Sequence, residues 1–209
     1  DIKALVMRLK SDPVLRRSLG YDYIENTPSA ATLNRFITLL SGTDILGRTF
    51  RRMVCKAKKL GLIDGTNVAI DASKLTSYEH AVPKSKIPMD DPTFPNWGGK
   101  LDTNGNFIKW FGWKMHALVD TYSSLPISYI ITPANIADVD VAEKLIQKMM
   151  DDYKNGLTPK YYMMDAGYDK PELYSSVYHK YHGQAIIPIN WRNTKIPPEG
   201  INWNGQLVC

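Results

Sequence analysis

The chain has 209 residues, of which 44% are hydrophobic and 22% are charged, a composition that excludes a disordered protein. This length allows one domain of ordinary size with a smaller appendage. No apolar stretch approaches the roughly 20 residues needed to cross a bilayer, so we expect no membrane partner. The first ten residues interleave charges and do not resemble a signal peptide. Two cysteines, Cys55 and Cys209, make no disulfide framework, so we expect a cytoplasmic protein.

The charge is distributed unevenly along the chain. The net charge is +5, but residues 1–60 hold 12 lysines and arginines against 5 aspartates and glutamates, which is +7. The remainder is mildly acidic, at −2. A basic segment joined to an acidic one indicates an element that faces a polyanion beside one whose chemistry uses carboxylates.

The first sixty residues have the periodicity of short helices. One pattern starts at Asp12-Pro13, a second at Ser29 and a third at Asp44, each with a residue that favours a helix start. The third leaves a group of basic residues off its apolar stripe: Arg48, Arg51, Arg52, Lys58 and Lys59. These residues suit contact with DNA phosphates, although a solvated helix face is the alternative. We therefore predict an N-terminal helical, DNA-binding region over 1–62.

From residue 66 the hydrophobic period changes to that of strands. The segment 78–106 is expected to be irregular because it is rich in Pro, Gly, Asp and Asn. The expected elements, in chain order, are strands at 67–71, 110–120 and 125–132, a helix capped by Asp138, a strand at 160–165, a helix from Asp169-Pro171 to Tyr181, and a strand at 184–190. This order predicts an α/β fold over 63–209, a mixed sheet flanked by helices of the ribonuclease H-like kind.

Two carboxylates take comparable positions on the predicted strands. Asp71 closes the apolar part of the first strand, and Asp165 follows that of the fourth. They are 94 residues apart, so only pairing of the two strands can bring them together. Neighbouring carboxylates repel unless a cation neutralises them, and Mg²⁺ or Mn²⁺ suits such oxygen ligands. Two such ions about 3.5–4 Å apart can hold the attacking and leaving oxygens of a phosphodiester.

Other polar residues have structural interpretations. Asp169 is predicted to cap the helix that follows it, and Asp64 and Asp120 lie beside turns, where acids are common. His116 lies on a strand and is expected to be buried, with support of a nearby site as the alternative. Lys74 is either solvated or in contact with a DNA phosphate.

Several motifs together resemble bacterial insertion-sequence transposases of the DDE type. The motifs are "SDPVLRRSLGYD" (11–22), "PSAATLNRFITLL" (28–40), "VAIDASKL" (68–75), "DDPTFPNWGGK" (90–100), "FGWKMHALVDTYSSLPISYIITPANIADV" (111–139) and "MMDAGYDKPEL" (163–173). The resemblance implies a ribonuclease H-like catalytic core in which Asp71 and Asp165 are the first and second metal ligands. It also implies metal-dependent hydrolysis at transposon ends, followed by attack of the freed 3′-hydroxyl on target DNA.

The same resemblance implies partners and a cellular place. Double-stranded DNA would be bound as terminal inverted repeats and as target, by a homodimer, at the nucleoid of a bacterial cell. Such enzymes need a third carboxylate on a helix after the fifth strand. Glu172 lies in the wrong element and Glu199 in a turn-like stretch, so we expect this ligand beyond residue 209 of a truncated chain.

Two alternatives to a transposase core remain open at this point. One is a DNA-binding remnant without catalytic activity, and the other is a nuclease or resolvase on the same fold. Cys209 is either inert or the first metal-binding thiol of an inserted segment.

Overall fold

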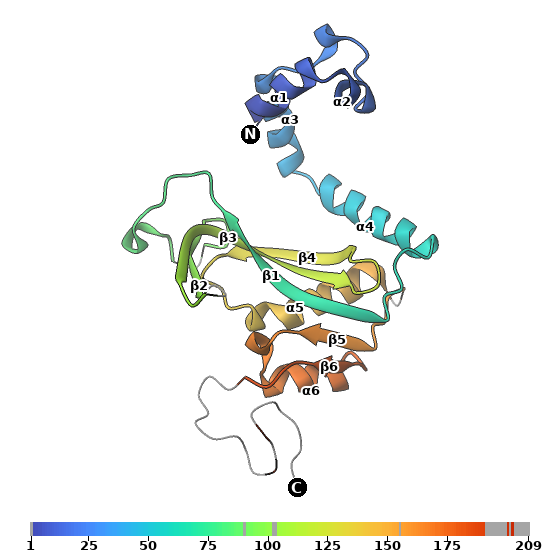
Figure 1. The fold of residues 1–209 in the computed structure, drawn as a ribbon, viewed down its shortest axis with the longest axis vertical. Helices are drawn as coiled ribbons and strands as arrows, with labels where there is room; N and C mark the ends of the chain where they lie inside the picture. Colours follow the sequence, from blue (N-terminus) through green and yellow to red (C-terminus); the bar gives the residue numbers. More distant parts are fainter. Residues whose placement is uncertain are drawn as a thin grey trace. The chain divides into compact units, whose positions relative to one another are not determined.

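The computed structural model of the protein describes residues 2–89, 91–101, 104–154 and 156–190, with Gly200 and Asn202 (Figure 1). The chain divides into two compact units between Arg52 and Met53. This division lies within a helix, ahead of the boundary predicted at residue 62. None of the helices in the described ranges is both long and apolar enough to span a membrane.

The first unit is made of helices whose starts follow the sequence signals. Its elements are α1 (Ile2–Ser11), α2 (Pro13–Ser18), η1 (Ile24–Asn26), α3 (Ala30–Ser41) and the first part of α4 (Ile45–Lys59). Asp12 Oδ1 accepts hydrogen bonds from two N–H groups of the first turn of α2. Ser29 accepts one from Thr32 at the start of α3. The two predicted helix caps are therefore confirmed.

The second unit is built on a mixed sheet. Its strands are β1 (Asn67–Thr76), β2 (Asn96–Leu101), β3 (Phe107–Asp120), β4 (Pro126–Pro133), β5 (Tyr161–Met164) and β6 (Gln184–Ile186). β3 pairs antiparallel with β1, β2 and β4, whereas β5 pairs parallel with β1 and with β6. Five of the strands therefore lie in the order β4-β3-β1-β5-β6, and β2 also pairs with β3. This is the predicted ribonuclease H-like arrangement, and the fold class is confirmed.

Two helices cover one face of this sheet. α5 (Val139–Tyr153) packs on β3 and β4, and α6 (Pro171–His179) packs on β6. The two helices also contact each other, so they share a face (Figure 1). The core between sheet and helices includes the fully buried side chains Val68, Leu118, Leu145, Ile146, Met149 and Tyr162. Side chains alternate along a strand, so Asp71 projects from the opposite face to Val68 and Ile70 and is exposed.

The structure corrects the prediction for the segment 78–106. It contains the 3₁₀ turn η2 (Lys84–Lys86) and the strand β2. The strand β2 was not predicted because it contains Gly98 and Gly99, and glycine is depleted in strands. A Cβ at Gly98 would lie 2.6 Å from the ring of Trp110, so glycine lets β2 pass close to that ring.

Candidate active site

Asp71 and Asp165 lie side by side at the carboxyl end of β5. The parallel register pairs Ile70 with Met164, so the next residues along the two strands are the two aspartates. Adjacent strands are about 4.8 Å apart. The predicted pairing of these two strands is therefore confirmed, and the 94-residue spacing equals the register offset between them. A crevice outside the carboxyl ends of parallel strands is the usual place for ligands in such sheets.

The strand β1 continues past the end of β5, which opens this edge. From Asp71 to Thr76 it pairs with β3, and β5 ends at Met164. Asp71 and Asp165 are both exposed. The two carboxylates are therefore accessible from solvent at the point where β5 ends and β1 continues.

Each carboxylate is held by one oxygen and leaves the other available. Asp71 Oδ1 accepts a hydrogen bond from the N–H of Ala72 at 2.7 Å. Asp165 Oδ1 accepts one from the N–H of Gly167 at 2.8 Å. The second oxygen of each has no hydrogen-bond partner within the described ranges. Magnesium is commonly bound by one or two carboxylates with water filling other positions, so this pair fits a divalent cation.

Tyr168 brings a buried hydroxyl into the field of these carboxylates. It lies in the 3₁₀ turn η3 (Ala166–Tyr168) that follows Asp165, and its side chain is 2% exposed. Burial raises the pKa of the hydroxyl, and the charges of Asp138, Asp71 and Asp165 raise it further. The hydroxyl therefore stays neutral. It has no hydrogen-bond partner in the part of the chain that is described.

Lys114 and Asp138 form an ion pair on the helix-covered face. Lys114 Nζ donates hydrogen bonds to Asp138 Oδ1 at 2.8 Å and to the carbonyl of Ile136 at 2.9 Å. Asp138 is at the predicted cap position of α5, but its side chain makes no capping hydrogen bond. The predicted helix start is confirmed, and the carboxylate binds Lys114 instead of the helix.

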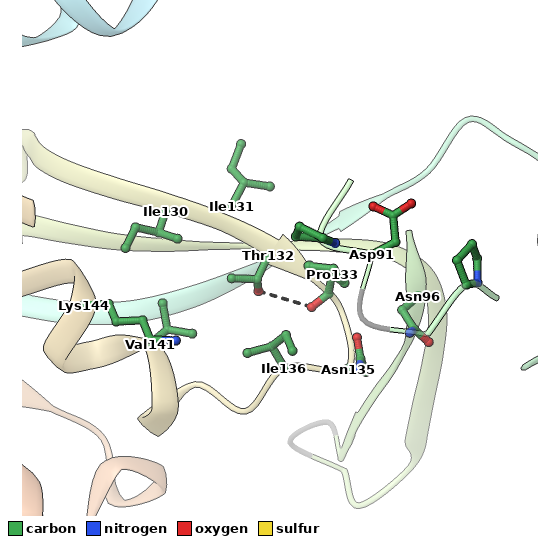
Figure 2. A pocket seen from close by; sticks show the side chains of 12 residues that line it. Asp91, Asn96, Ile130, Ile131, Thr132, Pro133, Asn135, Ile136, Val141 and Lys144 are labelled. Carbon is green, nitrogen blue, oxygen red and sulfur yellow. Dashed lines mark hydrogen bonds between the residues drawn. The ribbon is translucent and has the colours of Figure 1, made fainter. Parts of the chain in front are cut away.

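His116 is buried beside this ion pair, as predicted, with 1% of its surface exposed. Its Nε2 lies 2.9 Å from Thr132 Oγ1. The Thr132 hydroxyl donates to the carbonyl of Pro133 (Figure 2), so it accepts from His116 Nε2–H. Burial lowers the pKa of His116, the charge of Asp138 opposes this, and Lys114 lowers the pKa further. The imidazole is therefore neutral at neutral pH.

Thr132 also lines a cavity of about 300 Å³ at the edge strand β4. Figure 2 shows its wall, made of side chains from β4, the start of α5 and the segment 88–96. Half of the lining residues are proline or isoleucine, and Lys144 and Asp91 are its charged members. Neither Asp71 nor Asp165 lines this cavity, so it is separate from the paired carboxylates.

The basic residues predicted to bind DNA differ in their surroundings. Arg51 is paired with Asp44 at 2.6 Å, and Lys58 donates a hydrogen bond to the carbonyl of Asp64. The remaining predicted positions are exposed: Arg48, Arg52, Lys59 and Lys74. Lys74 lines a small cavity together with Lys100 and Lys114.

The other acids have structural roles. Asp120 is fully buried and accepts hydrogen bonds from the N–H of Gly65 and from Ser123. Burial acts to raise its pKa, but these hydrogen bonds outweigh it and hold the pKa below its usual value. The prediction for Asp169 is wrong, because Lys170 precedes α6. The Asp169 carboxylate instead accepts from the Tyr174 hydroxyl and the N–H of Asn190.

No third ligand joins the two aspartates in the described part of the chain. No group of three His, Cys, Asp or Glu residues there is arranged to hold a metal ion. Glu172 lies in the first turn of α6. Glu199 and Cys209 lie outside the described residues. The Lys114–Asp138 pair was not predicted, and the available signal was a lysine on a strand, in "WKMH", together with an aspartate just before a helix.

Comparison with known proteins identifies a family for most of the sequence. Residues 56–200 match the family model described as transposase DDE domain. No curated protein matches the sequence. A solved structure described as the cryo-EM structure of the piggyBac transposase synaptic complex with hairpin DNA is similar at 15% identity, with a TM-score of 0.43. That similarity covers 94% of this chain and 42% of that chain, so this chain spans less than half the length of that one.

Proposed function

Because the chain belongs to the transposase DDE domain family, we propose that it is the catalytic core of a DNA transposase. In this proposal it cleaves phosphodiester bonds at insertion-sequence ends and joins the freed 3′ ends to target DNA. The observation that carries the proposal is the β1–β5 register, which sets Asp71 beside Asp165. Paired carboxylates at an open strand edge suit metal-dependent phosphoryl transfer.

Members of this family generally use divalent metal ions. We assign Mg²⁺ or Mn²⁺ to this chain, with two ions in the complete site, held by the second oxygens of Asp71 and Asp165. Bound metal would polarise the phosphoryl oxygens and help to activate the attacking hydroxyl. The N–H groups of Ala72 and Gly167 fix the first oxygen of each carboxylate, which restricts the directions in which the second can point. The third carboxylate is proposed to come from beyond the described residues.

The proposed partner is double-stranded DNA, both as terminal inverted repeats and as target. Exposed cations on α4, with Lys74 in the second unit, would neutralise backbone phosphates. Two copies of the chain, one on each transposon end, are proposed to act together. In a bacterial cell this activity would take place at the nucleoid.

The test is excision of a marked element by the protein that the complete gene encodes. A donor plasmid carrying the element is supplied with wild-type protein, with Asp71→Asn or with Asp165→Asn. We expect excision to be lost in both variants and retained in Asp64→Asn, which changes an exposed turn acid. Excision at the wild-type level in either of the first two variants would refute the proposal.

A DNA-binding protein without catalytic activity is the second candidate. The observation in its favour is that the described residues offer two paired carboxylates and no third. It predicts salt-sensitive duplex binding by wild-type protein and by Asp71→Asn alike, with no excision by either. The excision assay therefore separates the two candidates.

A further inference from the structure

Three lysines surround a small cavity on the helix-covered face of the sheet. The cavity has a volume of about 80 Å³ and is lined by Ala72, Lys74, Gly99, Lys100, Trp110, Lys114 and Asp138. A cavity of about 10–15 Å³ already holds one water, so there is room here for one tetrahedral oxyanion. All of these residues belong to the second unit.

The strand register places like charges opposite each other at this cavity. Lys74 of β1 is the direct cross-strand partner of Lys114 of β3. Like charges directly opposite on a sheet are destabilising. Lys100 of β2 adds a third positive charge at the same cavity. A sheet that gathers three ammonium groups on one face needs negative charge there.

Asp138 supplies negative charge to one of the three lysines. It pairs with Lys114, whose side chain is 15% exposed. Two of the three N–H groups of that ammonium are used, by Asp138 and by the carbonyl of Ile136, which leaves one for a ligand. The ammonium groups of Lys74 and Lys100 have no ion-pair or hydrogen-bond partner among the described residues.

The floor of the cavity is fixed by packing. Trp110 is 7% exposed, and its Nε1 donates to the carbonyl of Trp113 at 3.3 Å. A Cβ at Gly98 would lie 2.6 Å from the Trp110 ring and 2.9 Å from the Cβ of Ala134. The ring is therefore held between β2 and the residue after β4, and the lysines stand around a rigid apolar base.

We propose that this cavity binds a phosphate group of a DNA strand, through Lys74, Lys100 and the remaining N–H of Lys114. Lys74 is three residues beyond Asp71, or about 10 Å along the strand. Successive residues of a strand project from opposite faces, so this site lies on the other face of the sheet from the side chain of Asp71. The assignment of the phosphate to DNA rests on the proposed function. The lysines themselves make the cavity a site for an oxyanion.

The first test is protection of lysines from an amine-acetylating reagent, read by mass spectrometry without divalent metal. Two probes are added separately: inorganic phosphate and a DNA duplex. We expect both to slow acetylation of Lys74 and Lys100 by several-fold while exposed Lys160, at the opposite end of β5, is unchanged. Unchanged acetylation of Lys74 and Lys100 with both probes would overturn the site. Protection by inorganic phosphate alone would overturn its assignment to DNA.

The second test is the salt dependence of duplex binding in EDTA. Lys74→Gln and Lys100→Gln should each lower the slope of log affinity against log salt by about 1. Because both lysines bind one phosphate, the double variant should lose less than the sum of the single losses. Lys160→Gln is the matched control. Additive losses, or losses equal to the control, would contradict a shared phosphate. Excision by Asp71→Asn tests the proposed function separately, since these measurements use no metal.

Discussion

His116 is fully buried and lies beside the Lys114–Asp138 ion pair. The imidazole donates from Nε2 to Thr132, and its Nδ1 has no hydrogen-bond partner in the described ranges. Burial lowers the pKa of His116 in the folded protein. At a pH near the ordinary histidine pKa, the unfolded chain therefore binds more protons than the folded one. Folding stability should therefore fall as the pH falls below about 6.5.

A His116→Gln variant should lose this part of the pH dependence, because glutamine does not titrate. Thermal unfolding between pH 7.5 and pH 5.5 measures it. We expect wild-type protein and His179→Gln, which removes an exposed histidine, to lose more stability over this range than His116→Gln. Equal losses in all three proteins would contradict a buried neutral imidazole.

Two buried tyrosines give opposite predictions when their hydroxyls are removed. The Tyr153 hydroxyl donates to the carbonyl of Ile127 at 2.9 Å, so Tyr153→Phe should lower the free energy of unfolding by about 1 kcal/mol. The Tyr168 hydroxyl has no such partner in the described residues. Tyr168→Phe should leave the free energy of unfolding unchanged or raise it. Urea denaturation in EDTA measures both free energies of unfolding. A loss for Tyr168→Phe as large as that for Tyr153→Phe would show that the Tyr168 hydroxyl makes a stabilising hydrogen bond.

At the scale of elements, the part of β1 beyond β5 depends on its pairing with β3. Gly112 faces Thr76 across this pair, where a Cβ would lie 2.2 Å from the carbonyl oxygen of Leu75 and 2.6 Å from the N of Ser77. These are backbone atoms, which cannot move without disturbing the pairing. Glycine is therefore required for the strand that carries Asp71 to keep its register.

Gly112→Ala should lower the free energy of unfolding by roughly 1–3 kcal/mol. Gly42→Ala is the control, because a Cβ there would meet one atom at 3.8 Å, and we expect its effect to stay within about 0.5 kcal/mol. Chemical denaturation measures both. A loss no larger for Gly112→Ala than for Gly42→Ala would show that the strand accommodates a side chain at this point.

Elements with a clear hydrophobic periodicity were predictable from the sequence, whereas features that depend on contacts between separate segments were not. The β3–β4 hairpin and α5 follow from their hydrophobic patterns, and the β1–β5 pairing follows from matching Asp71 with Asp165. β2 was missed because Gly98-Gly99 interrupts its pattern, although the same glycines make room for Trp110. The sequence predicts Asp169 as a helix cap because Pro171 follows two residues later, but its partners are Tyr174 and Asn190. Such distant partners have no local signal.

At the scale of the whole molecule, we expect electrostatic binding to duplex DNA. Log affinity should fall linearly with log salt. Arg48→Gln and Arg52→Gln should each reduce the slope by about 1. Arg51→Gln should reduce it less, because Asp44 already pairs with that guanidinium. Fluorescence anisotropy with a labelled duplex measures these slopes, and salt-independent binding would exclude phosphate contacts by α4.

The central claim is that Asp71 and Asp165 form one metal site. Calorimetric titration of the chain with Mn²⁺ in the presence of a DNA duplex, after subtraction of the heat of Mn²⁺ binding to the duplex alone, tests it most directly. We expect binding by wild-type protein and by Asp64→Asn, and loss of that binding in both Asp71→Asn and Asp165→Asn. Mn²⁺ binding that survives in either of these two variants, or no binding by wild-type protein, would contradict it.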